Sequence, residues 1–228
     1  MKTPIQIRTA RRPALLNSLL CCALLCLCFG HTLAAESDRI NLLALPSLAG
    51  WEENSFSGNT HYEVVQLDGS PALLASSNQS ASGLVHKQTI DLNQTPYLSW
   101  SWRVDHLLHD VDERSKGGDD YPARVYVVIS GGLLFWRTRA LNYVWSSNQA
   151  IGSQWPNAFT SNATLVAIRN NTSPLNQWLT EKRNIREDIK RYLGLDADHI
   201  DAVAIMTDTD NSGQSATAYY RDIVFTKR

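Results

Sequence analysis

Short runs rich in β-branched and aromatic residues recur along most of the chain, separated by Gly, Pro, Asn, Asp and Ser. Runs of this length, with turn-forming residues between them, are typical of short β-strands. The predicted strands are Tyr62–Leu67, Ala72–Ala75, Leu84–Ile90, Tyr97–Asp105, Arg124–Ser130, Ala140–Trp145, Leu165–Arg169, Ala202–Thr207 and Ala218–Phe225. Strands spaced this closely favour a sandwich over alternating strands and helices. We therefore expect a mostly β chain that folds as an antiparallel β-sandwich.

Alternation of apolar and polar residues is clearest in the range Tyr97–Asp105. Every second position is apolar: Leu98, Trp100, Trp102 and Val104. Successive side chains of a strand point to opposite faces of the sheet, so these four share one face, which we expect to lie in the core. The strand Arg124–Ser130 has a similar apolar face, and its other face carries Arg124 and Tyr126.

One segment has the periodicity of a helix. Between residues 178 and 193, apolar residues recur at helical spacing with charged residues between them, and Gly194 follows where a helix would end. The apolar positions are Trp178, Ile185, Ile189 and Leu193. The pattern predicts one helix near 178–193, lying across the sandwich or closing one of its ends.

The N-terminal segment has the three-part order of a secretory signal peptide. Basic residues come first, at Lys2, Arg8, Arg11 and Arg12. An apolar run follows from Ala14 to Phe29, and small residues come after it. The run is shorter than the ~20 apolar residues that span a bilayer, which disfavours a retained membrane anchor. We expect cleavage after Ala34 or Ala35, so that residues 1–35 are removed and residues 36–228 are periplasmic or secreted.

The composition of the mature part limits its chemistry. All four cysteines, Cys21, Cys22, Cys26 and Cys28, lie in the predicted signal peptide. Without the four early basic residues, 21 − 4 = 17 Lys and Arg stand against 22 Asp and Glu, a net charge of −5. No basic surplus neutralises phosphates, which argues against nucleic acid as a ligand. The remaining 228 − 35 = 193 residues suffice for one domain, and we expect 36–228 to form a single β-sandwich domain.

Four separated motifs occur in one order along the chain. They are Leu98–Val104, Gly118–Val127, Trp178 followed by Arg183-Asn184-Ile185, and Ala204–Gly213. Together they resemble the bacterial domain of unknown function family 3047, over residues 51 to 225. The resemblance implies exported proteins with a jelly-roll-like sandwich, similar to galactose-binding and carbohydrate-binding modules. It implies no established activity.

The predicted strand Ala202–Thr207 is followed by a polar segment that ends in Gly213. Oxygen-bearing side chains at alternate positions, Asp208, Asp210 and Ser212, resemble the first half of a calcium loop. Tyr219 occupies the position of the bidentate glutamate, so the second half is missing. The same residues suit a β-turn in which Asp208 and Asp210 accept nearby backbone N–H groups and Gly213 has a positive φ. A turn and a structural calcium site are both open interpretations.

The segment from His106 to Pro122 is a long polar loop between two predicted strands, and loops of this length are usually functional or mobile. Groups that suit a metal site or proton transfer are Asp105, His106, His109, Asp110, Asp112, Asp119 and Asp120. A solvated polar loop fits the same composition. Asp120 and Arg124 are predicted to form an ion pair at the end of the loop.

Two tryptophans lie outside the alternating patterns, Trp136 in a turn-like segment and Trp155 beside Pro156. Their rings suit stacking on a sugar, although filling the underside of a loop fits them equally well. The polar residues predicted to bond sugar hydroxyl groups are Asp119, Asp120, Arg124 and Tyr126.

The sequence contains no Gly-x-Ser-x-Gly motif and no His-Glu-x-x-His motif, and no catalytic residue is predicted. The predicted function is a non-catalytic periplasmic module that binds a carbohydrate or another cell-envelope ligand, with no cofactor except a candidate structural calcium. One alternative is a glycan-active lyase or hydrolase, in which Asp119 and Asp120, or Arg124, Tyr126 and His106, transfer protons. Another is an envelope domain that docks a protein partner. No feature predicts an oligomeric state.

Overall fold

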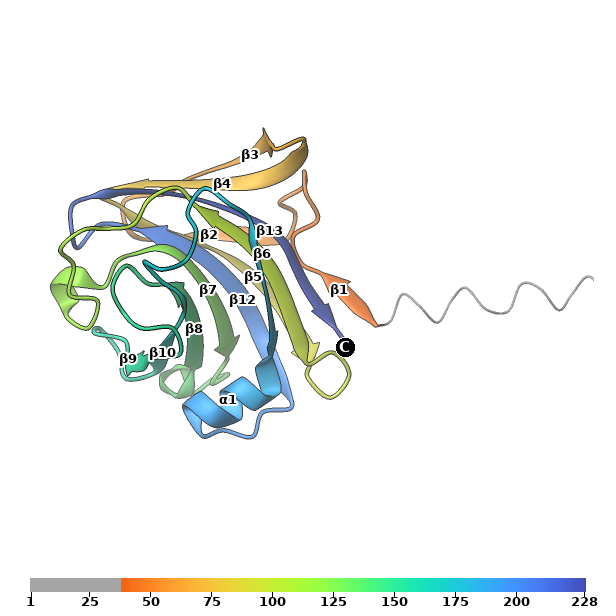
Figure 1. Cartoon of the computed structure of the whole chain (residues 1–228). Helices are drawn as coiled ribbons and strands as arrows, with labels where there is room; N and C mark the ends of the chain where they lie inside the picture. Colours follow the sequence, from red (N-terminus) through yellow and green to blue (C-terminus); the bar gives the residue numbers. More distant parts are fainter. Residues whose placement is uncertain (1–37) are drawn as a thin grey trace, which may run out of the picture. The chain divides into compact units, whose positions relative to one another are not determined.

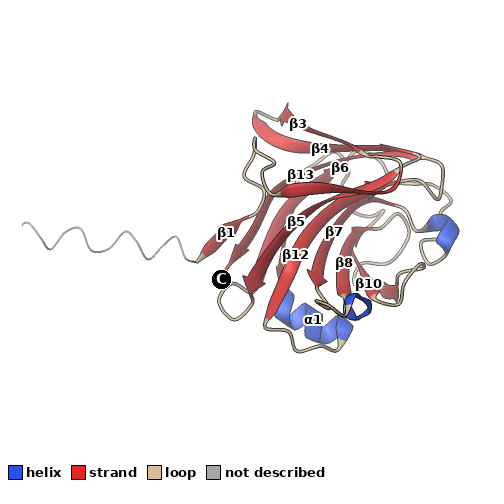
Figure 2. Cartoon of the chain, turned by 180° about the vertical axis from the view of Figure 1, so that it is seen from behind, coloured by secondary structure: helices blue, strands red, loops and turns tan. Residues whose placement is uncertain are grey.

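The computed structural model describes residues 38–228, and the predicted signal peptide, residues 1–35, lies outside the described residues. The described residues belong to one compact unit, in which two β-sheets form a sandwich (Figure 1). Figure 2 shows the same two layers from behind, with strands far outnumbering helices. The predicted mostly β sandwich is confirmed. Within residues 38–228, no helix has the length and apolar character that crossing a bilayer requires.

The smaller sheet is antiparallel throughout. Its strand order is β11 (Leu179–Asn184), β6 (Tyr97–Val104), β13 (Ser215–Thr226), β4 (Ser70–Asn78) and β3 (His61–Leu67). A further strand, β1 (Arg39–Asn41), pairs with the end of β13, beyond the part that pairs with β4. Asp68 and Gly69, which join β3 to β4, both have a positive φ, as a tight two-residue hairpin requires.

The larger sheet has seven strands and one parallel pair. Its order is β2 (Trp51–Ser57), β5 (Ala81–Asp91), β12 (His199–Asp208), β7 (Tyr121–Ile129), β8 (Arg139–Trp145), β10 (Ala163–Arg169) and β9 (Gln154–Pro156). β8 and β10 run parallel, so a hairpin cannot join them and the chain needs a long connection, residues 146–162. That connection carries β9 and the loop that follows it.

Every predicted strand is present, with ends that differ from the prediction by up to three residues. Four observed strands were not predicted: β1, β2, β9 and β11. β2 contains mostly polar, exposed residues, and β1 and β9 have three residues each, so none of them shows an apolar alternation. These strands form by backbone pairing with a neighbouring strand, which leaves little trace in side-chain pattern.

Trp100 and Trp102 of β6 are fully buried, which confirms that their face of the strand lies in the core. Trp100 stacks on Tyr143 with ring centroids 5.2 Å apart, and Trp102 meets Trp145 edge to face at 5.7 Å. Tyr143 and Trp145 belong to β8 of the other sheet, so these contacts join the two layers. Aromatic pairs of this kind add about 0.5–1.5 kcal/mol each beyond the burial of their area.

The helix is shorter than predicted. The observed helix α1 spans Ile185–Leu193, and residues 179–184, predicted as helix, form β11. Local helical spacing is overridden there because these residues pair along the edge of β6, where Glu181 accepts a hydrogen bond from Trp102 Nε1 at 3.1 Å. Pairing with an open strand edge outweighs a weak local propensity.

Local capping sets both ends of α1. The side chain of Asn184 accepts a hydrogen bond from the backbone N–H of Glu187 at 3.3 Å. Gly194 has a φ of 67°, the left-handed conformation that ends many helices, as its position predicted. The helix buries Ile185 and Ile189 and lies at one end of the sandwich (Figure 1). Loops lie at the opposite end of the larger sheet.

Candidate functional site

A pocket of about 480 Å³ lies on the outer face of the larger sheet. Arg124 and Tyr126 of β7 line it because they alternate with the core residues Val125 and Val127. The pocket is near the end of the sheet opposite α1, since β12 begins shortly after the helix and reaches the pocket with Asp208. Other lining residues include Phe56, Asp119, Asn157, Phe159, Met206, Asp210 and Asn211.

A β-bulge in β7 places the side chains of the site. Met206 of β12 pairs with Arg124. Asp208, two residues further along β12, pairs with Tyr121, which is three residues before Arg124. The extra residue in β7 brings Tyr121 and Arg124 to the same face and sets Asp208 beside them. Pro122 lies within the bulge, where a missing backbone N–H is tolerated.

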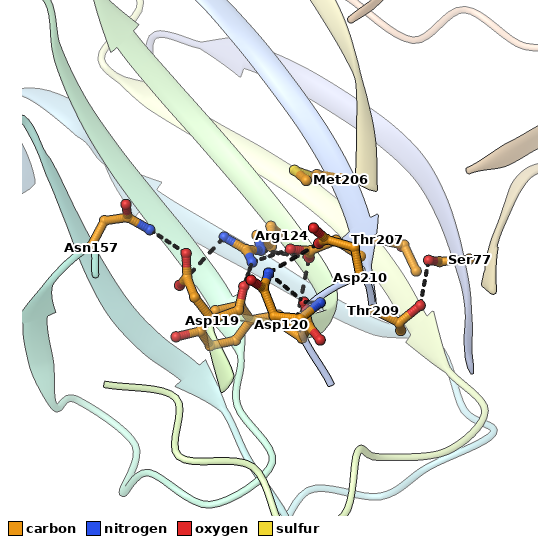
Figure 3. A network of polar contacts seen from close by, with 12 residues as sticks. Ser77, Asp119, Asp120, Arg124, Asn157, Met206, Thr207, Thr209 and Asp210 are labelled. Atoms are coloured by element: carbon orange, nitrogen blue, oxygen red, sulfur yellow. Dashed lines mark hydrogen bonds and ion pairs between the residues drawn. The ribbon is translucent and has the colours of Figure 1, made fainter. Parts of the chain in front are cut away.

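Arg124 is the centre of a buried polar network (Figure 3). Its Nε donates to Asp208 Oδ1 at 2.7 Å, and its Nη2 donates to Asp208 Oδ2 and to the backbone carbonyl of Asp119. Its Nη1 donates to the hydroxyl of Tyr126 at 3.0 Å. The guanidinium also lies 4.2 Å from the ring centroid of Tyr121. Charge-assisted, bidentate contacts of this kind give a buried guanidinium a fixed position.

Asp119 lies on the pocket wall and is only 4% exposed. Its Oδ2 accepts a hydrogen bond from Asn157 Nδ2 at 2.6 Å. Its Oδ1 is 3.9 Å from Arg124 Nη1 and accepts no hydrogen bond from any described residue. Figure 3 shows Asn157 and Arg124 approaching this carboxylate from different directions. One oxygen of the carboxylate therefore has a donor, and the other is buried without one.

Negative charge accumulates around the single guanidinium. The pKa of Asp208 is raised to about 8, mainly by burial and in smaller part by repulsion from Asp120 and Asp119, while Arg124 opposes the shift. Burial likewise raises the pKa of Asp119, with Arg124 opposing the shift. The pKa of Asp210 is raised by burial and then by Asp120. The site thus holds more carboxylates than its one cation neutralises.

Asp120 joins the two acidic residues that the sequence singled out. One carboxylate oxygen each of Asp120, Asp208 and Asp210 lies within 4.8 Å of the others. Asp120 also accepts from the backbone N–H groups of Asn211 at 3.3 Å and Ser212 at 2.5 Å. Three converging carboxylates are a ligand set that suits a hard cation such as calcium.

The turn after β12 differs from its predicted form in one respect. Gly213 has the predicted positive φ, 67°. Asp208 accepts a backbone N–H, as the turn interpretation expected, but the donor is Tyr121 at 3.3 Å, outside the turn, and Arg124 donates as well, so Asp208 is not the acceptor for N–H groups within the turn. Asp120, remote in sequence, takes that role.

The predicted Asp120–Arg124 ion pair is wrong as well. Arg124 pairs with Asp208 and Asp119 instead. The structure also separates the His and Asp residues of the 106–122 loop, which the sequence analysis grouped as candidates for one site. His106 bonds the backbone carbonyl of Ser215 at 2.9 Å and does not line the pocket. Among the aspartates of that loop, only Asp119 and Asp120 reach the network around Arg124.

Trp155 is not available to stack on a ligand. It is 4% exposed, and its Nε1 donates to the hydroxyl of Tyr121 at 3.2 Å. The alternative interpretation, a tryptophan that fills the underside of a loop, is the one that the structure supports. Trp136, in the short 3-10 helix Phe135–Arg137, is 57% exposed but does not line the pocket.

The sequence analysis did not identify two pocket residues, Phe56 and Phe159. Phe56 lies in β2 and Phe159 in the connection between β8 and β10. Each is a single aromatic residue within a polar stretch, Asn54-Ser55-Phe56-Ser57 and Asn157-Ala158-Phe159-Thr160. A single aromatic residue in a segment without other large apolar residues was the signal that could have identified them.

The buried ion pair predicts a large and non-additive effect on stability. Arg124→Met should lower the free energy of unfolding by about 3–5 kcal/mol, because Asp208 stays buried without a counter-charge. Urea unfolding of the single variants and of Arg124→Met/Asp208→Leu measures the coupling. The double variant should lose much less stability than the two single losses combined, and strictly additive losses would contradict the pairing.

Comparisons with known proteins give similar folds at low sequence identity. The chain is similar to a Family 11 carbohydrate-binding module from Clostridium thermocellum in complex with a β-1,3-1,4-mixed-linked tetrasaccharide. The identity is 11% over 83% of this chain and 95% of that chain, with a TM-score of 0.47. A Family 30 carbohydrate-binding module of a Clostridium thermocellum cellulosomal cellulase has 12% identity over 78% and 92%, with a TM-score of 0.46.

A third similar structure is the xyloglucanase domain of NopAA, a type three effector from Sinorhizobium fredii, in complex with cellobiose. It has 12% identity over 85% of this chain and 99% of that domain, with a TM-score of 0.45. No curated protein matches the chain in sequence. A family model described as a protein of unknown function (DUF3047) matches residues 49–224, so the chain belongs to that family, as its four motifs indicated.

Proposed function

We propose that this protein is an exported, non-catalytic module that binds a carbohydrate in the pocket on the outer face of the larger sheet. One observation carries the proposal: exposed aromatic rings and positionally fixed carboxylate and amide groups line the same cavity. Sugars offer both an apolar ring face and hydroxyl groups, so this combination matches their chemistry.

The aromatic part of the pocket consists of Phe56 and Phe159. Their exposed fractions are 68% and 56%, although both are large apolar side chains. They come from separate elements, β2 and the 146–162 connection, and meet at one cavity. Exposed apolar groups that gather around a hollow are typical of binding surfaces.

The polar part of the pocket is held in place before any ligand arrives. Arg124 and Asn157 fix the position of Asp119, and Arg124 also fixes Asp208 and the Tyr126 hydroxyl. A ligand that meets fixed groups orders few side chains on binding, and this lowers the entropic cost of association. The buried network therefore supports a preorganised binding site.

The same contacts favour binding over catalysis. A general acid or base must exchange its proton with the substrate. Of the groups named in the enzyme alternative, His106 is directed to the backbone carbonyl of Ser215, and both carboxylate oxygens of Asp120 accept backbone N–H groups of the turn after β12. A protein-docking function is the alternative that gains weight if no glycan binds.

The carboxylates Asp120, Asp208 and Asp210 support a second element of the proposal, a structural calcium ion beside the pocket. Ser212 Oγ is buried and has no hydrogen-bond partner among the described residues, so it could add an oxygen ligand. The cation would offset the excess of carboxylates over Arg124. This site extends the calcium loop predicted from Asp208, Asp210 and Ser212 by one residue, Asp120.

Removal of one aromatic ring should weaken glycan binding. Phe159→Ala should lower the affinity for a bound glycan roughly tenfold or more, because stacking on a ring is lost while the polar groups stay in place. Isothermal titration with the best ligand from a glycan panel measures the change. Trp136→Ala removes an exposed aromatic residue outside the pocket and serves as the control. Equal losses for both variants would argue against this pocket.

Calcium should stabilise the protein more strongly at high pH. Protons compete with the cation for Asp208 and Asp210, whose pKa values are raised, so calcium affinity should increase as the pH rises through about 8. Thermal melts with chelator and with calcium, at about pH 6 and about pH 9, measure the difference. Asp210→Asn should abolish it, whereas Asp196→Asn, an exposed carboxylate in a surface ion pair, should not. A calcium shift that is equal at both pH values would count against the site.

Export should remove the N-terminal segment. The protein recovered from the periplasm or the medium should begin at Ala35 or Glu36, since small residues precede the predicted cleavage positions. Intact mass and N-terminal sequencing check this. A full-length chain that remains in the cytoplasm would contradict the export proposal without affecting the pocket.

A further inference from the structure

We infer that the pocket selects neutral or amino sugars and discriminates against acidic glycans, with Asp119 Oδ1 as the acceptor that recognises the ligand. The inference rests on the proposed function and adds the chemical class of the ligand. Three observations carry it: an unpartnered buried acceptor, a described pocket lining whose one cation is already paired, and the excess of carboxylates around the cavity.

The acceptor is a carboxylate oxygen without a donor. Asp119 is 4% exposed, and its Oδ1 accepts no hydrogen bond from any described residue. Buried polar atoms in folded proteins are almost always paired, because an unpaired one retains the cost of its lost hydration. An ionised carboxylate can only accept. A ligand that pairs with this ionised oxygen has to offer an O–H or N–H, as a sugar hydroxyl or ammonium does.

The position of this acceptor is set by its neighbours. Asn157 Nδ2 holds Asp119 Oδ2 at 2.6 Å, and Arg124 Nη2 binds the backbone carbonyl of the same residue. With these two anchors, Asp119 cannot turn away from the pocket to satisfy Oδ1 elsewhere without breaking a contact. A fixed acceptor on the pocket wall acts as a specificity group because a ligand must bring the donor to it.

The one cation that lines the cavity is already committed. Among the described lining residues, Arg124 is the only Lys, Arg or His. Its Nε and Nη2 donate to Asp208, and its Nη1 donates to Tyr126. Lys116 lies nearby, but its Nζ is placed over the ring of Phe159, 5.5 Å from the centroid. Among the described lining residues, no uncommitted cationic side chain is left to receive a ligand carboxylate or phosphate.

The charge around the cavity opposes an anion. Asp119, Asp208 and Asp210 line the pocket and Asp120 adjoins them, whereas Arg124 is the one cation among the described lining residues. This excess of carboxylates strengthens the binding of a positively charged ligand and weakens the binding of a negatively charged one. Contact between like charges discriminates strongly between ligands.

The test is a glycan array on which each backbone is present in neutral, amino and uronate forms, probed with the purified protein in the presence of chelator. Chelator prevents a bound cation from offsetting the carboxylates. We expect signals on neutral or amino members, with the matching uronate at least about tenfold weaker by isothermal titration. Equal or tighter binding of the uronate overturns the inference and leaves the proposed function intact. No signal on any member, either in chelator or with added calcium, overturns both.

The variant Asp119→Asn tests whether Asp119 is the residue that causes the selectivity. It keeps the shape of the side chain and removes the charge, so affinity for the neutral or amino glycan should fall roughly tenfold while the difference from the uronate narrows. Asp222→Asn makes the same change in charge on β13 of the other sheet, at a carboxylate whose side chain is 64% exposed, and should change neither quantity. Unchanged selectivity in a folded Asp119→Asn, as judged by its thermal melt, overturns the role of Asp119. If that variant does not fold, the wild-type comparison of uronate and neutral forms still decides the selectivity.

Discussion

The ion pair between Arg124 and Asp208 is the interaction on which the site depends. It joins the central strand of the larger sheet, β7, to its neighbour β12, on the face opposite the core. A buried charge costs several kcal/mol of lost hydration, so it persists only with close partners and further hydrogen bonds. Arg124 has both, since it also binds Tyr126 and the backbone of Asp119. Through Asp119, the ion pair anchors the end of the 106–120 loop at the pocket.

Strand β7 contributes side chains both to the core and to the site. On its inner face β7 contributes Val125 and Val127 to the packing between the sheets, and on its outer face it carries Arg124 and Tyr126. The tryptophans of β6 and the aromatic residues of β8 hold the layers together beneath. Because core packing fixes the strand, the polar side chains on its other face have little freedom to move. Rigidity of the pocket is thus a consequence of the sandwich.

The pocket itself forms where segments distant in sequence meet. The 106–120 loop brings Asp119, the connection between β8 and β10 brings Asn157 and Phe159, and β2 brings Phe56. The connection is long because β8 and β10 are parallel. An exception to the antiparallel pattern therefore provides the segment that carries part of the binding surface. The helix closes the opposite end of the sandwich and takes no part in the site.

The sequence by itself determined the sandwich, most of its strands and the core position of Trp100 and Trp102, because alternation of apolar residues reports directly which face of a strand is buried. It also identified Arg124, Tyr126, Asp119 and Asp208 as polar residues of interest. It placed Trp155 among the stacking candidates and paired Arg124 with Asp120, and both predictions were wrong. Only the tertiary structure decided that Trp155 is buried against Tyr121 and that Arg124 pairs with Asp208.

The reason is that contacts between remote segments depend on strand order, register and bulges. The bulge in β7 puts Asp208 beside Arg124, and the pairing of β11 with β6 converts part of a helical pattern into a strand. Neither depends on a local pattern, because each is set by hydrogen bonds to a neighbour far away in the chain. Side-chain periodicity records burial, and it carries no information about which buried or exposed groups face one another.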